Sequence, residues 1–227
     1  MADELRVMLE FGPKGKQVVA VAPDWPGLER GAKTEESALQ RLRAYLPRYS
    51  PVASLAGLTA TFADTASATL NVVERFPGTG STDFWGISFA FSSSDQQALS
   101  RGELERELTL LRACWALFDD ARARVSPEMR RGPRGGGRDR DRIVRHVLGT
   151  ELDWAGKLGV SAALDTLLSG AGLSAYRDAY CGAIRALPAE GKPARSWPLR
   201  YLIRHTAYHT LDHAWEMEDK DLTASKA

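Results

Sequence analysis

The sequence predicts an α+β protein, with a small sheet-containing domain at residues 1–94 and a four-helix bundle at residues 95–227. Near the N-terminus apolar residues alternate with polar ones, which is the period of a half-buried strand. From about residue 102 onward apolar residues recur every three or four positions, which is the period of an amphipathic helix. The polar run SSSDQQALSRG separates the two patterns, so we place the boundary near residue 95.

The first segment predicts a strand hairpin followed by a helix. Apolar residues alternate over residues 5–11, and after the turn GPKGK the run QVVAVA resumes as a second strand. The stretch APDWPGLERG turns the chain. Thr34 is placed to cap a helix over residues 35–45, and we expect Pro47 to end it, since proline disrupts a helix interior.

Residues 57–92 are rich in Thr, Ala, Phe and Gly and predict an extension of this sheet. The expected strands are ATF, TLNVVERF and WGISFAFS, with a turn at FPGTGSTDF. Large aromatic residues are more often core than ligand contacts. We therefore assign Trp85, Phe89 and Phe91 to the core.

The second half predicts four helices. A long amphipathic helix spans about residues 102–125, a second contains His146, a third runs over about residues 173–187, and a fourth begins at Ser196-Trp197-Pro198, with proline in its first turn. The connection RRGPRGGGRDRDR before the second helix is irregular because of its glycines and Pro133.

That connection concentrates positive charge, and it has two interpretations. It is either a solvated mobile loop, or some of its arginines meet carboxylates or phosphates of an anionic substrate or cofactor. Arg138 and Arg142, which directly precede the His146 helix, are the candidates for cofactor binding. The other arginines of the segment are Arg130, Arg131, Arg134 and Arg140.

Three of the four histidines lie four residues apart in RYLIRHTAYHTLDHAWEMED. Residues at this spacing stack on one helix face, so two imidazoles can share a metal ion. The apolar stripe contains His213 and borders His209, whereas His205 is rotated toward the side of Asp212 and Glu216. We predict that His209 and His213 form the pair, and that His205 is an outer neighbour or lies at a pocket mouth.

His146 supplies the third predicted ligand, because it borders the apolar face of its own helix and bundles build metal sites from facing helices. Three histidines suit zinc first, and also nickel, iron or copper. An open fourth position would activate a water or a thiol. Glu151 and Glu216 are candidate general bases or orienting residues, although such a residue is more often a helix-surface carboxylate.

From about Gln96 to Asp221 the chain resembles the DinB-like four-helix bundle superfamily, on the strength of His146 and the HxxxH pair His209 and His213. The resemblance implies a divalent metal held by these three residues. It also implies an activity like that of members that are transferases or isomerases dependent on a low-molecular-weight thiol. The segment AWEME departs from the short polar run that follows the pair in many members.

The first 50 residues resemble the small HicB-like fold, in which a PDxPG turn, here PDWPG, joins a strand hairpin to a helix. HicB-like domains are best known as antitoxin halves that mask a ribonuclease. A DNA-binding appendage is not evident, so we interpret this domain as an interaction or dimerisation module.

Composition and the N-terminal sequence bear on the binding partners and the cellular location that we expect. A net charge of +1 gives no general attraction to nucleic acid or to a membrane. The acidic start MADELRVMLEF lacks signal-peptide features, and no run reaches the roughly 18 apolar residues of a membrane span. Cys114 and Cys181 fall in predicted helices and suggest reduced thiols. We expect a cytoplasmic protein that forms a homodimer, the commonest oligomer.

Three functional hypotheses follow. The first is a metal-dependent transferase or hydrolase in which the metal activates a thiol or water toward a small electrophilic substrate. The second is a non-catalytic metal-binding stress or interaction protein with a closed coordination sphere, completed by Glu151 or His205, whose N-terminal domain recruits a partner. The third and weakest is an antitoxin-like regulator.

Overall fold

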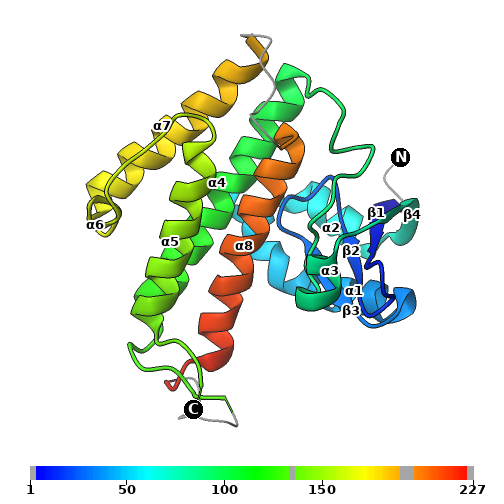
Figure 1. The fold of residues 1–227 in the computed structure, drawn as a ribbon, viewed down its shortest axis with the longest axis horizontal. Coiled ribbons are helices and arrows are strands. Elements are labelled where there is room, and N and C mark those ends of the chain that lie inside the picture. Colours follow the sequence, from blue (N-terminus) through cyan, green and yellow to red (C-terminus); the bar gives the residue numbers. More distant parts are fainter. Residues whose placement is uncertain (1–3, 133–135, 190–196, 224–227) are drawn as a thin grey trace.

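The computed structural model describes residues 4–132, 136–189 and 197–223. It has a four-stranded sheet in the N-terminal part and, after residue 100, only helices and their connections (Figure 1). The predicted α+β class is therefore confirmed. The finer assignments to HicB-like and DinB-like folds stay predictions, as does the homodimer.

The sheet consists of β1 (Glu4–Phe11), β2 (Val18–Val21), β3 (Glu29–Ala32) and β4 (Thr69–Pro77), in the order β3-β2-β1-β4. Strands β1 and β2 form the predicted antiparallel hairpin, and β4 pairs parallel to β1. Both sheet faces are buried: Leu5, Val7 and Leu9 join the main core, whereas the intervening Met8 packs in a second cluster. Strand β3 was not predicted, because it lies inside the stretch that we assigned to a turn.

Helix α1 (Glu35–Leu55) begins as predicted, with the hydroxyl of Thr34 accepting from the backbone N–H of Ser37 at 3.2 Å. The prediction that Pro47 ends the helix was wrong, since α1 continues through Pro47 and Pro51. The apolar face persists beyond Pro47: Tyr49 is buried and donates to the carbonyl of Pro26 at 2.8 Å. Packing of this kind offsets the cost of about 3 kcal/mol that an interior proline imposes.

Two further predictions for residues 57–92 were wrong. The expected strand ATF lies in helix α2 (Thr59–Ser67), where Phe62 packs against Trp25 with ring centroids 4.8 Å apart. The expected turn overlaps the short helix α3 (Gly80–Trp85), which begins with a capping box between Thr79 and Thr82. Short apolar runs do not distinguish strand from helix, and here tertiary packing decided the outcome.

The segment WGISFAFS forms no strand, although it passes beside the sheet. Its backbone N–H groups at Phe89 and Ala90 donate to the buried carboxylate of Glu10, at 3.0 and 3.3 Å, instead of to a neighbouring strand. The hydroxyl of Ser88 donates to the same carboxylate at 2.6 Å. One acidic side chain of β1 therefore replaces the hydrogen-bond ladder that we expected.

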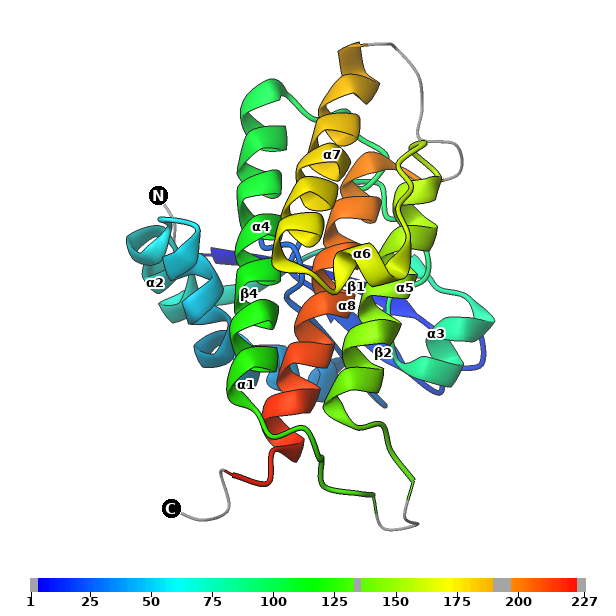
Figure 2. The ribbon, with the colours of Figure 1, turned by 90° about the vertical axis from the view of Figure 1, so that its left-hand side faces the viewer.

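The helical part contains α4 (Arg101–Arg124), α5 (Arg140–Gly156), α6 (Leu164–Leu167), α7 (Gly170–Ala189) and α8 (Leu199–Lys220), and the four long helices lie alongside one another (Figure 2). The four predicted helices are thus present. Pro198 is the N-cap of α8 rather than a residue of its first turn, and Ser196 lies outside the described residues. None of the helices in the described ranges has the length and apolarity needed to cross a membrane. Cys114 and Cys181 are buried and free, as expected.

Helix α8 lies between the other long helices and the sheet part (Figure 1). More than half of its 22 residues are buried, and one hydrophobic cluster runs without interruption from the sheet through α8 into α4 and α5. The two halves that we predicted from the sequence thus share a core.

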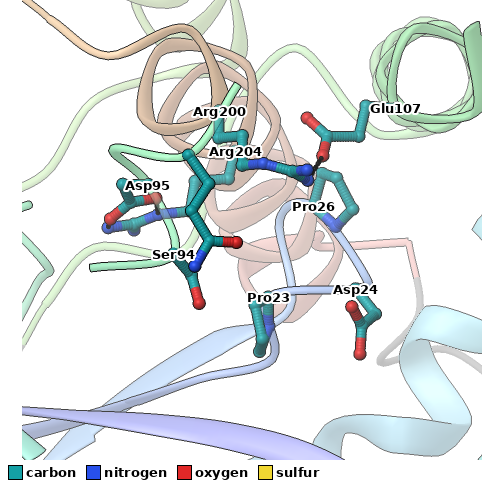
Figure 3. A pocket seen from close by; sticks show the side chains of 9 residues that line it. Pro23, Asp24, Pro26, Ser94, Asp95, Glu107, Arg200 and Arg204 are labelled. Carbon is teal, nitrogen blue, oxygen red and sulfur yellow. Dashed lines mark hydrogen bonds and ion pairs between the residues drawn. The ribbon is translucent and has the colours of Figure 1, made fainter. Parts of the chain in front are cut away.

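Arg204 of α8 makes the main polar connection between the halves. Its guanidinium donates twice to Asp95, at 2.8 Å each (Figure 3). It also donates to Glu29 at 3.2 Å. Asp95 belongs to the polar run that we expected to be a linker, yet it is only 3 % exposed. The ion pair therefore fixes the chain where it passes from the sheet part to the helices.

We expect Arg204→Met to lower the free energy of unfolding by about 3–5 kcal/mol, because it leaves Asp95 buried without its cation. Arg185→Met is the matched control, since Arg185 makes an equally close bidentate pair with Glu105, at 2.8 Å, on the exposed surface. That variant should cost less than about 1 kcal/mol. Urea denaturation at neutral pH measures both, and similar losses in the two variants would contradict this account.

Glu29 is buried in the same network. Burial raises the pKa of its carboxyl from 4.5 to about 8, against the opposing effect of Arg204 and with support from nearby Glu10. The loss of hydration on burial disfavours the carboxylate more than the nearby Arg204 favours it. Glu29 is therefore protonated in the folded protein at neutral pH.

This protonation predicts a pH dependence of stability. Between the unfolded pKa of 4.5 and the folded pKa of about 8, Glu29 takes up a proton on folding, so its contribution to stability falls as pH rises. Glu29→Gln removes the uptake. The free energy of unfolding of the variant, relative to that of the wild type, should rise by about 1 kcal/mol per pH unit from about pH 5 to pH 8. Urea denaturation at several pH values checks this, and a difference that does not vary with pH would exclude it.

Candidate metal centre

Helices α5 and α8 pack side by side (Figure 2). Three of their histidines come together at this contact. The Nε2 atoms of His146 on α5 and His209 on α8 are 3.2 Å apart. With His213, one turn after His209, the three residues offer ring nitrogens that all lie within 4.8 Å of one another. Their convergence is as the sequence predicted; metal binding itself stays a prediction.

The spacing suits a divalent ion. Two imidazole nitrogens that each bind zinc at about 2.0–2.1 Å with a tetrahedral angle are about 3.3 Å apart, close to the His146–His209 separation of 3.2 Å. Two facing Nε2 atoms can share at most one proton, so a cation is a natural partner for both. The three residues present therefore fit a metal ion.

The surroundings keep the ligands in the form that binds metal. Burial, reinforced by Arg138 and His213, lowers the pKa of His146 to about 4. Burial and the neighbouring histidines lower the pKa of His209 to about 2. Both imidazoles are consequently neutral at physiological pH, and a neutral ring nitrogen carries the lone pair that a metal needs.

Glu216 orients His213. Its carboxylate lies 2.7 Å from Nδ1 of His213 and also accepts from Lys220. The hydrogen bond with His213 contributes most to lowering the pKa of Glu216 to about 2. A carboxylate with so low a pKa is a weak base, so the arrangement favours the orienting role over the general-base role among our two expectations.

The structure does not bring Glu151 to the histidines. It is 1 % exposed and lies among residues of α4 and α7, with Arg177 Nε at 3.8 Å, and burial raises its pKa to about 7. Five residues at about 100° each place Glu151 roughly 140° around α5 from His146. Helix α5 is buried on two sides. Glu151 lies on the side that faces α4 and α7, whereas we expected it on the side of His146.

The arginines of the loop have different positions. Arg138 lines the cavity beside the histidines. The side chain of Arg142 is 72 % exposed and pairs with Asp139 at 3.6 Å, which agrees with the solvated interpretation for this residue. Arg134 lies outside the described residues.

His205 is not a member of the histidine cluster. It is 4 % exposed, stacks on Tyr201 with ring centroids 5.0 Å apart, and also contacts Trp154. We expected His205 to be an outer neighbour of the pair or to lie at a pocket mouth. It lines the same cavity as the three clustered histidines, and Phe89 of the sheet part packs against its ring.

The histidines open into a cavity of about 360 Å³. The sheet part contributes Trp85, Ile87 and Phe89 to its wall, and the helices contribute Thr150, Trp154, Tyr208 and Asp212. Our assignment of Trp85 to the core was wrong, since it is 63 % exposed. Nothing in the sequence indicated that residues 85–89 lie against the histidines, because only the fold of the intervening chain brings them there.

A smaller hollow of about 40 Å³ lies between the sheet part and α8, lined by Arg200, Arg204, Glu107 and Asp95 (Figure 3). Its charges already pair with one another, with Arg200 donating to Glu107 at 2.7 Å. Space of this size holds a water molecule or two rather than a substrate. The histidine cavity is therefore the better candidate site.

Comparison of the chain with protein-family models, with curated proteins and with solved structures gives no match.

Proposed function

We propose that the protein is a metal-dependent enzyme in which His146, His209 and His213 hold one divalent ion, with zinc as the first choice and nickel or iron as alternatives. The observation that carries the proposal is the convergence of three imidazoles at a cavity, without a fourth metal-binding side chain in the cluster among the described residues. Three protein ligands and an open position distinguish catalytic zinc from structural zinc.

The reaction that this arrangement supports best is transfer or hydrolysis at a small electrophilic substrate. A bound divalent ion supplies Lewis acidity and lowers the pKa of a water or thiol toward neutrality. The three imidazoles hold the ion, and Glu216 fixes the ring of His213. The aromatic walls place apolar surface around the site, and Arg138 offers a positive charge to an anionic substrate or to a low-molecular-weight thiol.

The resemblance to DinB-like proteins supports the same proposal, because it assigns the same three residues to the metal. The alternative of a structural metal in an interaction protein has less support. Its two suggested fourth ligands lie elsewhere: Glu151 faces Arg177, and His205 stacks on Tyr201. The sheet part, which we expected to recruit a partner, also contributes a wall of the cavity. An antitoxin-like role has no support from these contacts.

Metal content tests the ligand set. Wild-type protein loaded with zinc and then desalted should retain about one zinc per chain, and His146→Asn, His209→Asn and His213→Asn should each lose most of it, because two imidazoles hold zinc far more weakly than three. His205→Gln is the matched control, since it changes the remaining histidine, and should retain zinc. Circular dichroism confirms folding. Equal zinc retention in all four variants would contradict the proposal.

Activity is tested on the same samples. The probes are 4-nitrophenyl acetate for water as nucleophile and 1-chloro-2,4-dinitrobenzene with glutathione for a thiol. We expect zinc to accelerate at least one of the two reactions. His209→Asn should reduce that rate by at least about tenfold, because a protein that no longer holds the metal cannot activate the water or the thiol. Rates that are the same with and without zinc for both probes would count against an enzyme of this class.

A further inference from the structure

We propose that the cavity selects an aromatic carboxylic acid, with its ring against the aromatic walls and its carboxylate at Arg138. This inference rests on the proposed function and names the substrate class of the same site.

The walls favour a flat apolar ring. Trp85 and Phe89 come from the sheet part, and Trp154 comes from α5, with its ring centroid 5.3 Å from that of His209. Aromatic rings attract one another in edge-to-face and offset arrangements. A volume of about 360 Å³ is at the small end of ligand pockets, which matches a molecule of one or two rings.

One wall is held in place before any ligand arrives. The carboxylate of Glu10 accepts from Ser88 and from the N–H groups of Phe89 and Ala90, and Glu10 itself is fully buried. The segment that carries Ile87 and Phe89 is thus anchored to β1. A fixed wall loses little freedom on binding, so it discriminates between ligand shapes more strongly than a mobile loop does.

The charge of the cavity favours an anion. Asp212 is the acidic residue of the described lining, and it lies 3.4 Å from the guanidinium of Arg30, which offsets its charge. Arg138 also lines the cavity and forms no ion pair within the described part of the chain. A divalent ion held by the three imidazoles would add further positive charge. A carboxylate is the planar anion that a guanidinium binds with two hydrogen bonds.

The test measures binding to the zinc-loaded full chain by isothermal titration calorimetry. The probe is 2-naphthoate; 2-naphthamide has the same rings without the charge, and hexanoate has the charge without the rings. We expect 2-naphthoate to bind at least about tenfold more tightly than either. Equal affinities for the three molecules would overturn the inference.

Neighbouring residues of α3 provide a matched pair of variants. Trp85→Ala should weaken 2-naphthoate binding about tenfold, because Trp85 lines the cavity. Phe84→Ala removes the adjacent exposed aromatic side chain, which packs on Trp85 with ring centroids 4.5 Å apart but does not line the cavity, and should weaken binding by about twofold at most. Both positions are on the surface, so folding should survive. If the two changes weakened binding equally, the proposal that the aromatic ring of the ligand lies against Trp85 would be overturned.

Arg138→Gln tests the carboxylate. It should abolish most of the preference for 2-naphthoate over 2-naphthamide, and an unchanged preference would overturn the role of Arg138. Zinc content measured on the same samples separates the two proposals. One zinc per chain without binding of 2-naphthoate overturns the ligand class alone, whereas absence of zinc overturns the proposed function and this inference with it.

Discussion

Burial of α8 between the sheet and the other long helices is the constraint on which the rest of the structure depends. A helix covered on most sides must find partners for its polar side chains, because an unpaired buried charge is costly. Arg204 meets Asp95 and Glu29, and Thr206 lies 3.3 Å from the hydroxyl of Tyr180. The histidines on the side toward α5 instead open into the cavity, so α8 both connects the two halves and supplies the candidate site.

The site therefore belongs to the whole chain rather than to the helical half. His146 and Trp154 come from α5, the histidine pair comes from α8, and Trp85 and Phe89 come from the sheet part. The anchoring of residues 88–90 by Glu10 gives the N-terminal half a role that a separate interaction module would not have. It forms a wall of the cavity and covers His205.

The convergence of the three histidines was predictable because it depends on local rules. The HxxxH spacing fixes the pair on one helix face, and the apolar periodicity around His146 points it toward the same core. The long helices were predictable for the same reason. Glu151 was misplaced because α5 has two buried sides, and periodicity alone does not say which one faces α8.

The errors in the first half have a different origin. Residues 85–92 look like a strand, but the backbone N–H groups of residues 88–90 donate to Glu29 and Glu10, which lie more than fifty residues away in the sequence. The burial of His205 also depends on a distant contact, because Phe89 of the sheet part packs against its ring. Contacts of this range depend on the tertiary fold, which no local pattern encodes.

The most direct test of the central claim is X-ray absorption spectroscopy at the zinc edge of the loaded protein. The account predicts three imidazole nitrogens at about 2.0–2.1 Å, with their characteristic multiple scattering, and one further light atom that exchanges with solvent. A spectrum with fewer than three imidazoles, or with a sphere filled entirely by protein ligands, would contradict it.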